Sequence, residues 1–214
     1  KKGTVAWKLS IPDAYQWPDR LTDKLPKPLE LLAGQINSEG KLQWENGSTT
    51  ASGKIHALNW QGLWQQQPFS GGVLKSTFQL LKSGTLIAKH AQLSIAEFNP
   101  AIDVKQITSE LSLTLPLKAP KKARIRVNSL SAQLFSGAIK TAAPFELEPF
   151  APDTQLEVKL DNISLAEILA LEQQPIQGSG HLDGSLPLRF DPTGIRIDDR
   201  EIRARLPGGW IQMQ

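Results

Sequence analysis

The sequence predicts an all-β protein with one short helix, in which long antiparallel strands form an extended, curved sheet. Apolar and polar residues alternate in nearly every segment, which is typical of strands that bury one face. Gly, Pro and Asn separate these segments, and Asn46-Gly47 favours a tight hairpin between neighbouring strands. Several alternating runs reach roughly 12 to 18 residues, longer than the usual strand of about 5 to 6 residues.

Three segments show the alternation most clearly, and in each the apolar side chains fall on one face. The parity of the apolar positions shifts between Val127 and Leu130, which predicts a β-bulge. Further turns are predicted at Ser83-Gly84 and at Asp191 to Gly194. The apolar residues of the three segments are Ile107, Leu111, Leu113, Leu115 and Leu117; Leu156, Val158 and Leu160; and Ile176, Gly178, Gly180, Leu182, Gly184, Leu186, Leu188 and Phe190.

One helix is predicted over residues 164–173. Ser164 and Glu167 have the spacing of a capping box, and Leu165, Ile168, Leu169 and Leu171 form an apolar stripe. A weaker helical turn is predicted after Pro18, where Trp17, Leu21 and Leu25 recur at four-residue spacing before Pro26 and Pro28 end it.

The apolar faces of the strands must contact another apolar surface. In a closed β-sandwich that surface is a second sheet, whereas in an open groove it is a ligand such as lipid. Periodicity fits both arrangements, and taken alone it favours the closed core. The choice between the two therefore depends on further observations.

Composition excludes several classes of function. The 24 basic and 21 acidic residues are spread along the chain, so no basic footprint for nucleic acid is present. The absence of Cys excludes disulfides and thiolate metal sites. No apolar run reaches the roughly 18 residues that span a bilayer. Both ends of the sequence resemble strands that have been cut short. We expect residues 1–214 to form a single elongated β segment excised from a larger protein.

No catalytic, cofactor or metal site is expected. His56, His90 and His181 lie in separate predicted strands without the close spacing of zinc ligands. The sequence has no nucleophile elbow, phosphate-binding loop or dinucleotide fingerprint. Asp198 and Asp199 are adjacent in the sequence, so on a strand they would point to opposite faces. The protein is therefore not expected to be an enzyme.

Two polar features could bind a ligand. Trp60, Trp64 and Gln65 belong to a Trp- and Gln-rich stretch that could stack against a carbohydrate, although core and rim packing is the favoured interpretation. A basic hairpin surrounds Ala119-Pro120 and could meet anionic lipid headgroups, although such a cluster is more often a solvated tip. The basic residues of this hairpin are Lys118, Lys121, Lys122, Arg124 and Arg126.

Four motifs follow one another after Ser131. They are a Gly-containing strand at 134–139, a capped helix at 160–171, a Gly-rich strand at 178–188 and a Pro-Gly-Gly turn at 204–211. In this order they resemble the C-terminal region of the YdbH-like branch of the AsmA-like intermembrane lipid transport proteins, long labelled as a dicarboxylate-transport domain. The family-like portion is 131–214. Residues 93–104 and 25–29 are also similar, so the resemblance extends loosely over most of the chain.

The resemblance implies a periplasmic, inner-membrane-anchored protein of Gram-negative bacteria whose strands curl into an open, taco-like trough that conducts phospholipid to the outer membrane. With this resemblance, an open groove is favoured over a closed sandwich as the architecture of the protein. The resemblance also implies membrane contact through regions outside this sequence and an outer-membrane lipoprotein partner near the C-terminal end. It implies no catalytic residue or cofactor. No residue constellation supports dicarboxylate transport.

Two functions follow from these observations. The first is a phospholipid-transport segment that shields acyl chains in an apolar β groove. The alternative is a closed β scaffold, or a module that binds a carbohydrate or a small acid. The residues predicted to line the lipid groove are Leu111, Leu113, Leu115, Leu156, Val158, Leu160, Leu182, Leu186 and Leu188.

Overall fold

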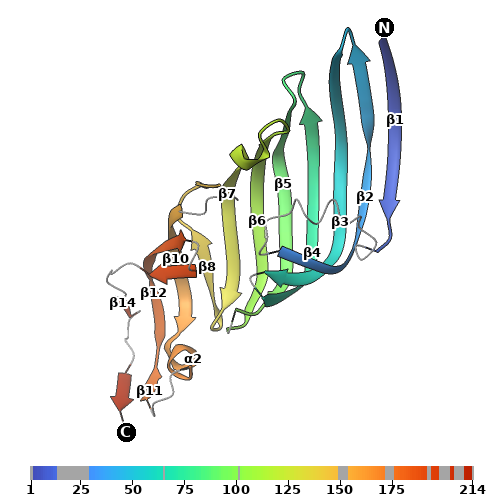
Figure 1. Ribbon diagram of the computed structural model, residues 1–214. Coiled ribbons are helices and arrows are strands. Elements are labelled where there is room, and N and C mark those ends of the chain that lie inside the picture. The colour runs from blue at the N-terminus through green and yellow to red at the C-terminus, as the bar shows by residue number, and fades with distance from the viewer. Residues whose placement is uncertain are drawn as a thin grey trace.

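The computed structural model describes residues 2–13, 29–64, 66–100, 102–148, 154–171, 176–191, 194–197, 203–204 and 210–213. Most of these residues belong to one antiparallel sheet of 13 strands, shown in Figure 1. Eleven of the strands follow one another across the sheet in the order β1-β2-β3-β4-β5-β6-β7-β8-β10-β12-β13, while β9 pairs with β7 and β14 with β12. The prediction of an all-β fold built from sequential antiparallel neighbours is confirmed.

The strands are long. β2, β3, β4, β5 and β6 each contain between 13 and 17 residues. The strands of the large sheet are β1 (Lys2–Ile11), β2 (Leu29–Glu45), β3 (Ser48–Trp64), β4 (Gln67–Leu80), β5 (Thr85–Phe98), β6 (Val104–Pro116), β7 (Arg124–Leu134), β8 (Gly137–Thr141), β9 (Phe145–Leu147), β10 (Thr154–Ser164), β12 (His181–Asp191), β13 (Gly194–Ile197) and β14 (Arg203–Ala204).

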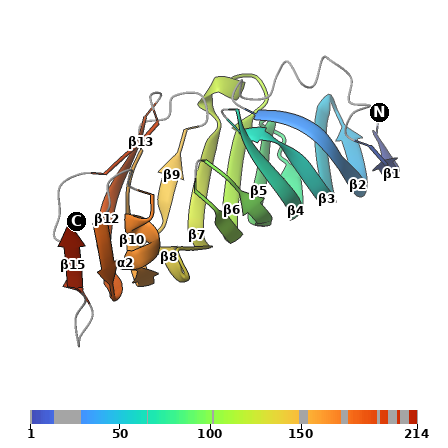
Figure 2. The ribbon, with the colours of Figure 1, turned by 90° about the horizontal axis from the view of Figure 1, so that it is seen from below.

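The sheet is open. β1 forms one edge and β13 the other, and the sheet does not close on itself. The N-terminus and the C-terminus lie at opposite ends of the sheet (Figure 1), and a view from below shows the strands as one curved layer (Figure 2). The expected open, curved sheet is therefore confirmed, and the alternative of a closed β-sandwich is wrong. The physical reason is that, among the described residues, no second sheet packs face to face on the apolar side of the large one.

A second, small sheet pairs β11 (Ile176–Ser179) with β15 (Trp210–Met213). The sequence predicts a single strand over 176–190, but the structure divides it at Gly180, whose φ of 111° suits glycine. Residues 176–179 therefore belong to the small sheet, whereas β12 belongs to the large sheet. The predicted alternation of β12 is retained.

The predicted helix is present but shorter than expected. Helix α2 (Leu165–Leu169) has five residues, and Ser164 caps it by accepting a hydrogen bond from the backbone N–H of Glu167 at 3.3 Å. The capping box is only half formed, because the Glu167 carboxylate accepts a hydrogen bond from Ser136 Oγ instead. Residues 172–173 and the helical turn predicted around Trp17 to Leu25 lie outside the described residues. A 3₁₀ turn, η2 (Pro120–Lys122), lies between β6 and β7.

The predicted turns agree with the structure where it describes them. Asn46 and Gly47 have positive φ angles of 49° and 78°, which both central residues of a tight β2–β3 hairpin require. The turn at Ser83-Gly84 is wider, because it spans Leu81 to Thr85, whose backbone groups are hydrogen-bonded. Asp191 pairs with Gly194 as expected, and residues 192–193 lie outside the described residues.

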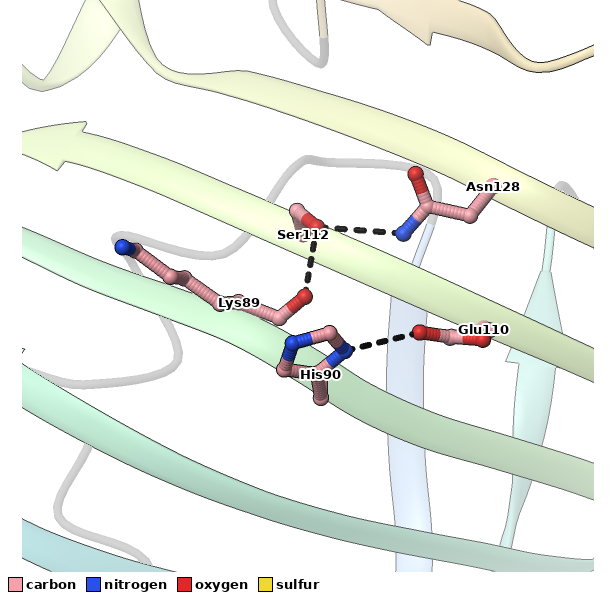
Figure 3. A network of polar contacts seen from close by, with 5 residues as sticks. All are labelled: Lys89, His90, Glu110, Ser112 and Asn128. Carbon is pink, nitrogen blue, oxygen red and sulfur yellow. Dashed lines mark hydrogen bonds and ion pairs between the residues drawn. The ribbon is translucent and has the colours of Figure 1, made fainter.

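Bulges bend the long strands. The strand register shifts between Glu110 and Leu111 on β6 where β7 carries an extra residue, Asn128, so the bulge predicted between Val127 and Leu130 is confirmed. A second bulge on β5 lies at the same level, between Ala88 and Ala91. Ser112 lies between the two bulges, donating to the Lys89 carbonyl at 2.7 Å and accepting from Asn128 Nδ2 at 3.1 Å (Figure 3). The two bulges thus share one polar network.

The buried interior is thin. Among the described residues, the side chains that are less than 9% exposed are small or medium-sized, and no large side chain is fully buried. The accessible surface of the chain is 14351 Å², whereas a compact protein of this mass would have about 9,800 Å². The excess is expected of a single curved layer. The buried apolar residues are Ile36, Ala57, Ala88, Ala91, Ala123, Val127, Ala132, Val158 and Ile163.

Candidate functional site

The candidate site is the apolar face of the large sheet. Residues directly opposite each other on paired strands point to the same face, so the register shows which side chains lie together. On β6, Leu111, Leu113 and Leu115 alternate with polar residues. They pair with Ala91, Ala88 and Leu86 of β5, and Leu111 and Leu113 also pair with Val127 and Ile125 of β7.

The same face continues through the C-terminal strands. Ala132 of β7 pairs with Ile139 of β8, and Ile139 pairs with Leu160 of β10. On β12 the partners of β10 residues are also apolar. Leu156 pairs with Leu188, Val158 with Leu186, and Ile163 with Leu182. The structure thus brings all the residues predicted to line a groove onto one face, although they belong to three strands far apart in the sequence.

The apolar face also covers the N-terminal strands, where the sequence analysis named no lining residue. Val5, Trp7 and Ile11 of β1 share this face with their β2 partners Leu42, Gly40 and Ile36. The face continues through residues 51, 55 and 57 of β3 to Leu74, Phe78 and Leu80 of β4. Strict alternation of apolar residues would have marked these strands, but Gly40, Gly53, Ser38 and Ser76 interrupt it.

The apolar side chains of this face are not enclosed. All the predicted lining residues are half-buried, except Val158, which is 3% exposed. Val5, Leu9 and Trp44, which share the face near the N-terminal edge, are 51%, 49% and 39% exposed. The described residues include no second layer over this face, and an exposed apolar face of this kind is typical of an interaction site.

The opposite face is polar and charged. Glu39, Lys54 and Thr77 pair across β2, β3 and β4, and all three are exposed. In the C-terminal strands Lys159 pairs with Ser185 of β12 and Lys140 of β8. The sheet therefore separates an apolar face from a hydrated one over its whole described width.

The histidines do not form a metal site in the described part of the chain, where no group of three or more potential ligands occurs. His90 Nδ1 lies 2.9 Å from Glu110 Oε1 on the neighbouring strand (Figure 3), in a pair whose side chains are 78% and 43% exposed. His56 lies on β3 and His181 begins β12, so the three residues are on different strands. Asp198 and Asp199 lie outside the described residues.

The Trp- and Gln-rich stretch forms the end of β3. Trp60 packs against Gly34 and Gly72, and its indole nitrogen is buried without a hydrogen-bond partner. Trp64 is 42% exposed. Gln65 lies outside the described residues. Trp60 thus serves mainly to pack adjacent strands together, while Trp64 is the accessible aromatic residue.

The predicted basic hairpin is the connection between β6 and β7. Lys118, Lys121 and Lys122 are exposed on it. Arg124 and Arg126 follow on β7, where Arg126 pairs with Glu146 at 3.6 Å. None of the helices in the described residues is long and apolar enough to span a membrane.

No curated protein and no solved structure is significantly similar to the chain. A family model described as YdbH-like, intermembrane phospholipid transport protein YdbH, matches residues 12–214. This is a transport family rather than a class of enzymes, and its work between two membranes indicates a periplasmic location. Since the match covers nearly the whole chain, the protein belongs to the YdbH-like family of intermembrane phospholipid transport proteins.

Proposed function

We propose that this chain is a segment of a phospholipid-transport bridge and that its apolar face forms a groove that shields acyl chains between the inner and outer membranes. The observation that carries the proposal is the continuous apolar face, which extends from β1 to β12 and has no second layer over it among the described residues. Family membership supports phospholipid as the ligand.

The energetics favour a passive conduit. Each CH₂ group that leaves water for an apolar surface contributes about 0.8 kcal/mol. Leucine and valine side chains supply such a surface along β6, β10 and β12 without forming a specific bond. A lipid can therefore be held strongly enough to leave a membrane and still slide from one set of side chains to the next. No covalent chemistry is required, so transport along this face needs no catalytic residue.

We also propose that residues 1–214 belong to a longer protein. They would form one periplasmic segment of a chain that is anchored in the inner membrane, and an outer-membrane lipoprotein would contact the C-terminal end. The edges at β1 and β13, which have no further partner strand among the described residues, are consistent with a longer sheet, because an edge strand can pair with an additional strand.

Photocrosslinking tests the groove. A photoreactive amino acid at Leu113 is expected to crosslink to phospholipid in cells, because this residue lies on the apolar face between Ala88 and Ile125. The matched control is Thr114, the next residue of the same strand, which is exposed on the opposite face. Equal crosslinking at the two positions, or none at Leu113, would contradict the proposal.

A charge in the groove tests transport. Leu186→Asp is expected to block lipid passage, because moving an acyl chain past a carboxylate costs several times the contribution of one CH₂ group. Ser185→Asp introduces the same charge on the adjacent residue of β12, whose side chain points to the other face. The measurement is phospholipid transfer to the outer membrane, with circular dichroism as a check that both variants fold. Normal transfer in folded Leu186→Asp protein would exclude the conduit.

A further inference from the structure

The connections at the two ends of strands β2 to β8 differ in charge. Because the strands pair antiparallel with their sequence neighbours, the β2–β3, β4–β5 and β6–β7 connections meet at one end, the upper end in Figure 1. We call this end the basic rim, formed by residues 46–47, 81–84 and 117–123. The β3–β4, β5–β6 and β7–β8 connections, residues 65–66, 99–103 and 135–136, form the opposite rim.

The basic rim carries a cluster of lysines. Lys82 lies on the β4–β5 turn, and Lys118, Lys121 and Lys122 lie on the β6–β7 connection. All four side chains are exposed, and none forms an ion pair within the described part of the chain. The described residues of the opposite rim include no Lys or Arg, and Asp103 is its charged residue.

Backbone hydrogen bonds hold the two lysine-bearing connections together. The N–H of Leu117 donates to the carbonyl of Gly84 at 2.9 Å, which links the β6–β7 connection directly to the β4–β5 turn. Within the β6–β7 connection, Lys122 donates to Ala119 at 2.9 Å. The lysines are therefore presented from fixed backbone positions, which lowers the ordering cost of binding an anion.

Exposed leucines flank these lysines. Leu81 precedes Lys82 and is 40% exposed, and Leu117 precedes Lys118 and is 50% exposed. Moving down β6 from this rim, the apolar positions Leu115, Leu113 and Leu111 follow. From Leu115 to Leu111 the strand covers about 13 Å, which is similar to the roughly 15 Å that an acyl chain spans in half of a bilayer core. The order from rim to centre is thus cationic, then aliphatic, which complements a lipid that has an anionic phosphate followed by aliphatic chains.

We infer that Lys82, Lys118, Lys121 and Lys122 bind the phosphate of a groove-held phospholipid, so that each lipid lies with its headgroup at the basic rim and its acyl chains directed along the strands toward the opposite rim. This inference rests on the proposed function. A phosphodiester satisfies several ammonium groups at once, and exposure at the rim keeps the rest of the headgroup hydrated. The polar face of the sheet would then contact no lipid.

Lipids with a photoreactive group test this orientation on the purified protein. Phosphatidylglycerol with a diazirine on its headgroup is expected to label peptides that contain residues 81–84 and 117–123. The same lipid with the diazirine at the end of an acyl chain is expected to label mainly elsewhere on the apolar face. Headgroup labelling at residues 99–103 and 135–136, or equally at both rims, would overturn the inference while leaving acyl-chain binding in place.

A lysine variant supplies the second measurement. Changing the four rim lysines to Gln is expected to weaken phosphatidylglycerol binding roughly tenfold or more, since each surface lysine contributes about 1 kcal/mol of attraction to an anionic lipid. The matched control removes the same charge from exposed positions on the polar face, and it is expected to bind as the unmodified protein does. Equal weakening in both variants would overturn the inference. The control changes are Lys8→Gln, Lys54→Gln, Lys75→Gln and Lys159→Gln.

The lysines could instead face an anionic membrane surface. Flotation with vesicles of phosphatidylcholine and phosphatidylglycerol separates the two sources of phosphate. If the rim variant loses vesicle binding but retains the headgroup labelling of groove-bound lipid, the lysines serve the membrane and the inference is overturned. If the unmodified protein takes up no lipid in either assay, the proposed function fails as well. Loss of headgroup labelling in the rim variant alone supports the inference.

Discussion

Trp7 and Phe78 stack on the apolar face with their ring centroids 6.2 Å apart, although they belong to β1 and β4. Two strands separate them, and at this level both strands carry glycine. A Cβ atom on Gly40 or on Gly53 would clash with the Trp7 indole. Trp7 Nε1 also donates to Ser38 Oγ at 3.3 Å. The two glycines therefore make a shallow depression in which one indole ring covers β2 and β3.

This arrangement predicts that Gly40→Ala destabilises the sheet. The added methyl group would displace Trp7 and press on the Ser52 carbonyl, so the free energy of unfolding should fall by about 1 to 3 kcal/mol. Chemical denaturation measures the change. Lys41→Ala alters the next residue on the exposed polar face and should shift stability by less than about 0.5 kcal/mol. Similar stabilities for the two variants would show that Trp7 does not occupy the depression.

The open face predicts an unusual pattern of alanine substitutions. Leu113 is half-buried, so Leu113→Ala should cost only about 1 kcal/mol of unfolding free energy. Ile163 is 2% exposed, and Ile163→Ala should cost about 2 to 4 kcal/mol. Thermal unfolding of the two variants without lipid makes the comparison. A cost at Leu113 as large as that at Ile163 would mean that a second layer covers the apolar face.

Much of the fold could be predicted from the sequence because its rules are local. The period-two alternation identified β6, β10 and β12, and Asn46-Gly47 identified a hairpin. Even the bulge at Asn128 was predictable, since an extra residue shifts the parity of the apolar positions. Each of these signals acts between residues close in the sequence.

Other features depend on distant contacts and could not be predicted in this way. Alternation is the same whether an apolar face meets a second sheet or a ligand, so periodicity alone wrongly favoured the closed sandwich. The N-terminal part of the site was missed because Gly40 and Gly53 break the alternation, and only the packing of Trp7 explains them. The break at Gly180 reflects pairing of 176–179 with the distant 210–213.

The bulge on β7 predicts that one residue can be removed without moving the apolar side chains of the strand to the opposite face of the sheet. Deletion of Asn128 leaves Val127 and Leu130 on the apolar face, because β6 has no residue opposite Asn128. The variant should fold and lose only about 1 kcal/mol from the missing hydrogen bond to Ser112. Deletion of Ser131 is the control.

Deleting Ser131 should be much more harmful, because it moves Ala132 and Leu134 to the polar face. Circular dichroism and thermal unfolding compare the two deletions. If both abolish folding, the polar network at the bulge is required for the strand to form. If both are tolerated, the register of β7 is not fixed by its apolar face.

The β7–β8 hairpin predicts a stabilising substitution. Its two turn residues, Phe135 and Ser136, have φ angles of 49° and 54°, in a left-handed conformation that Asn adopts more readily than Phe. The turn is held by a 2.8 Å hydrogen bond from the Ser164 N–H to the Phe135 carbonyl, a backbone contact that Phe135→Asn retains. Relief of the strained conformation should therefore raise the free energy of unfolding by about 1 kcal/mol. Phe78→Asn, on the apolar face, should lower it instead by about 2 to 4 kcal/mol. A loss of stability in Phe135→Asn would show that the Phe135 ring contributes more through packing than its backbone loses to strain.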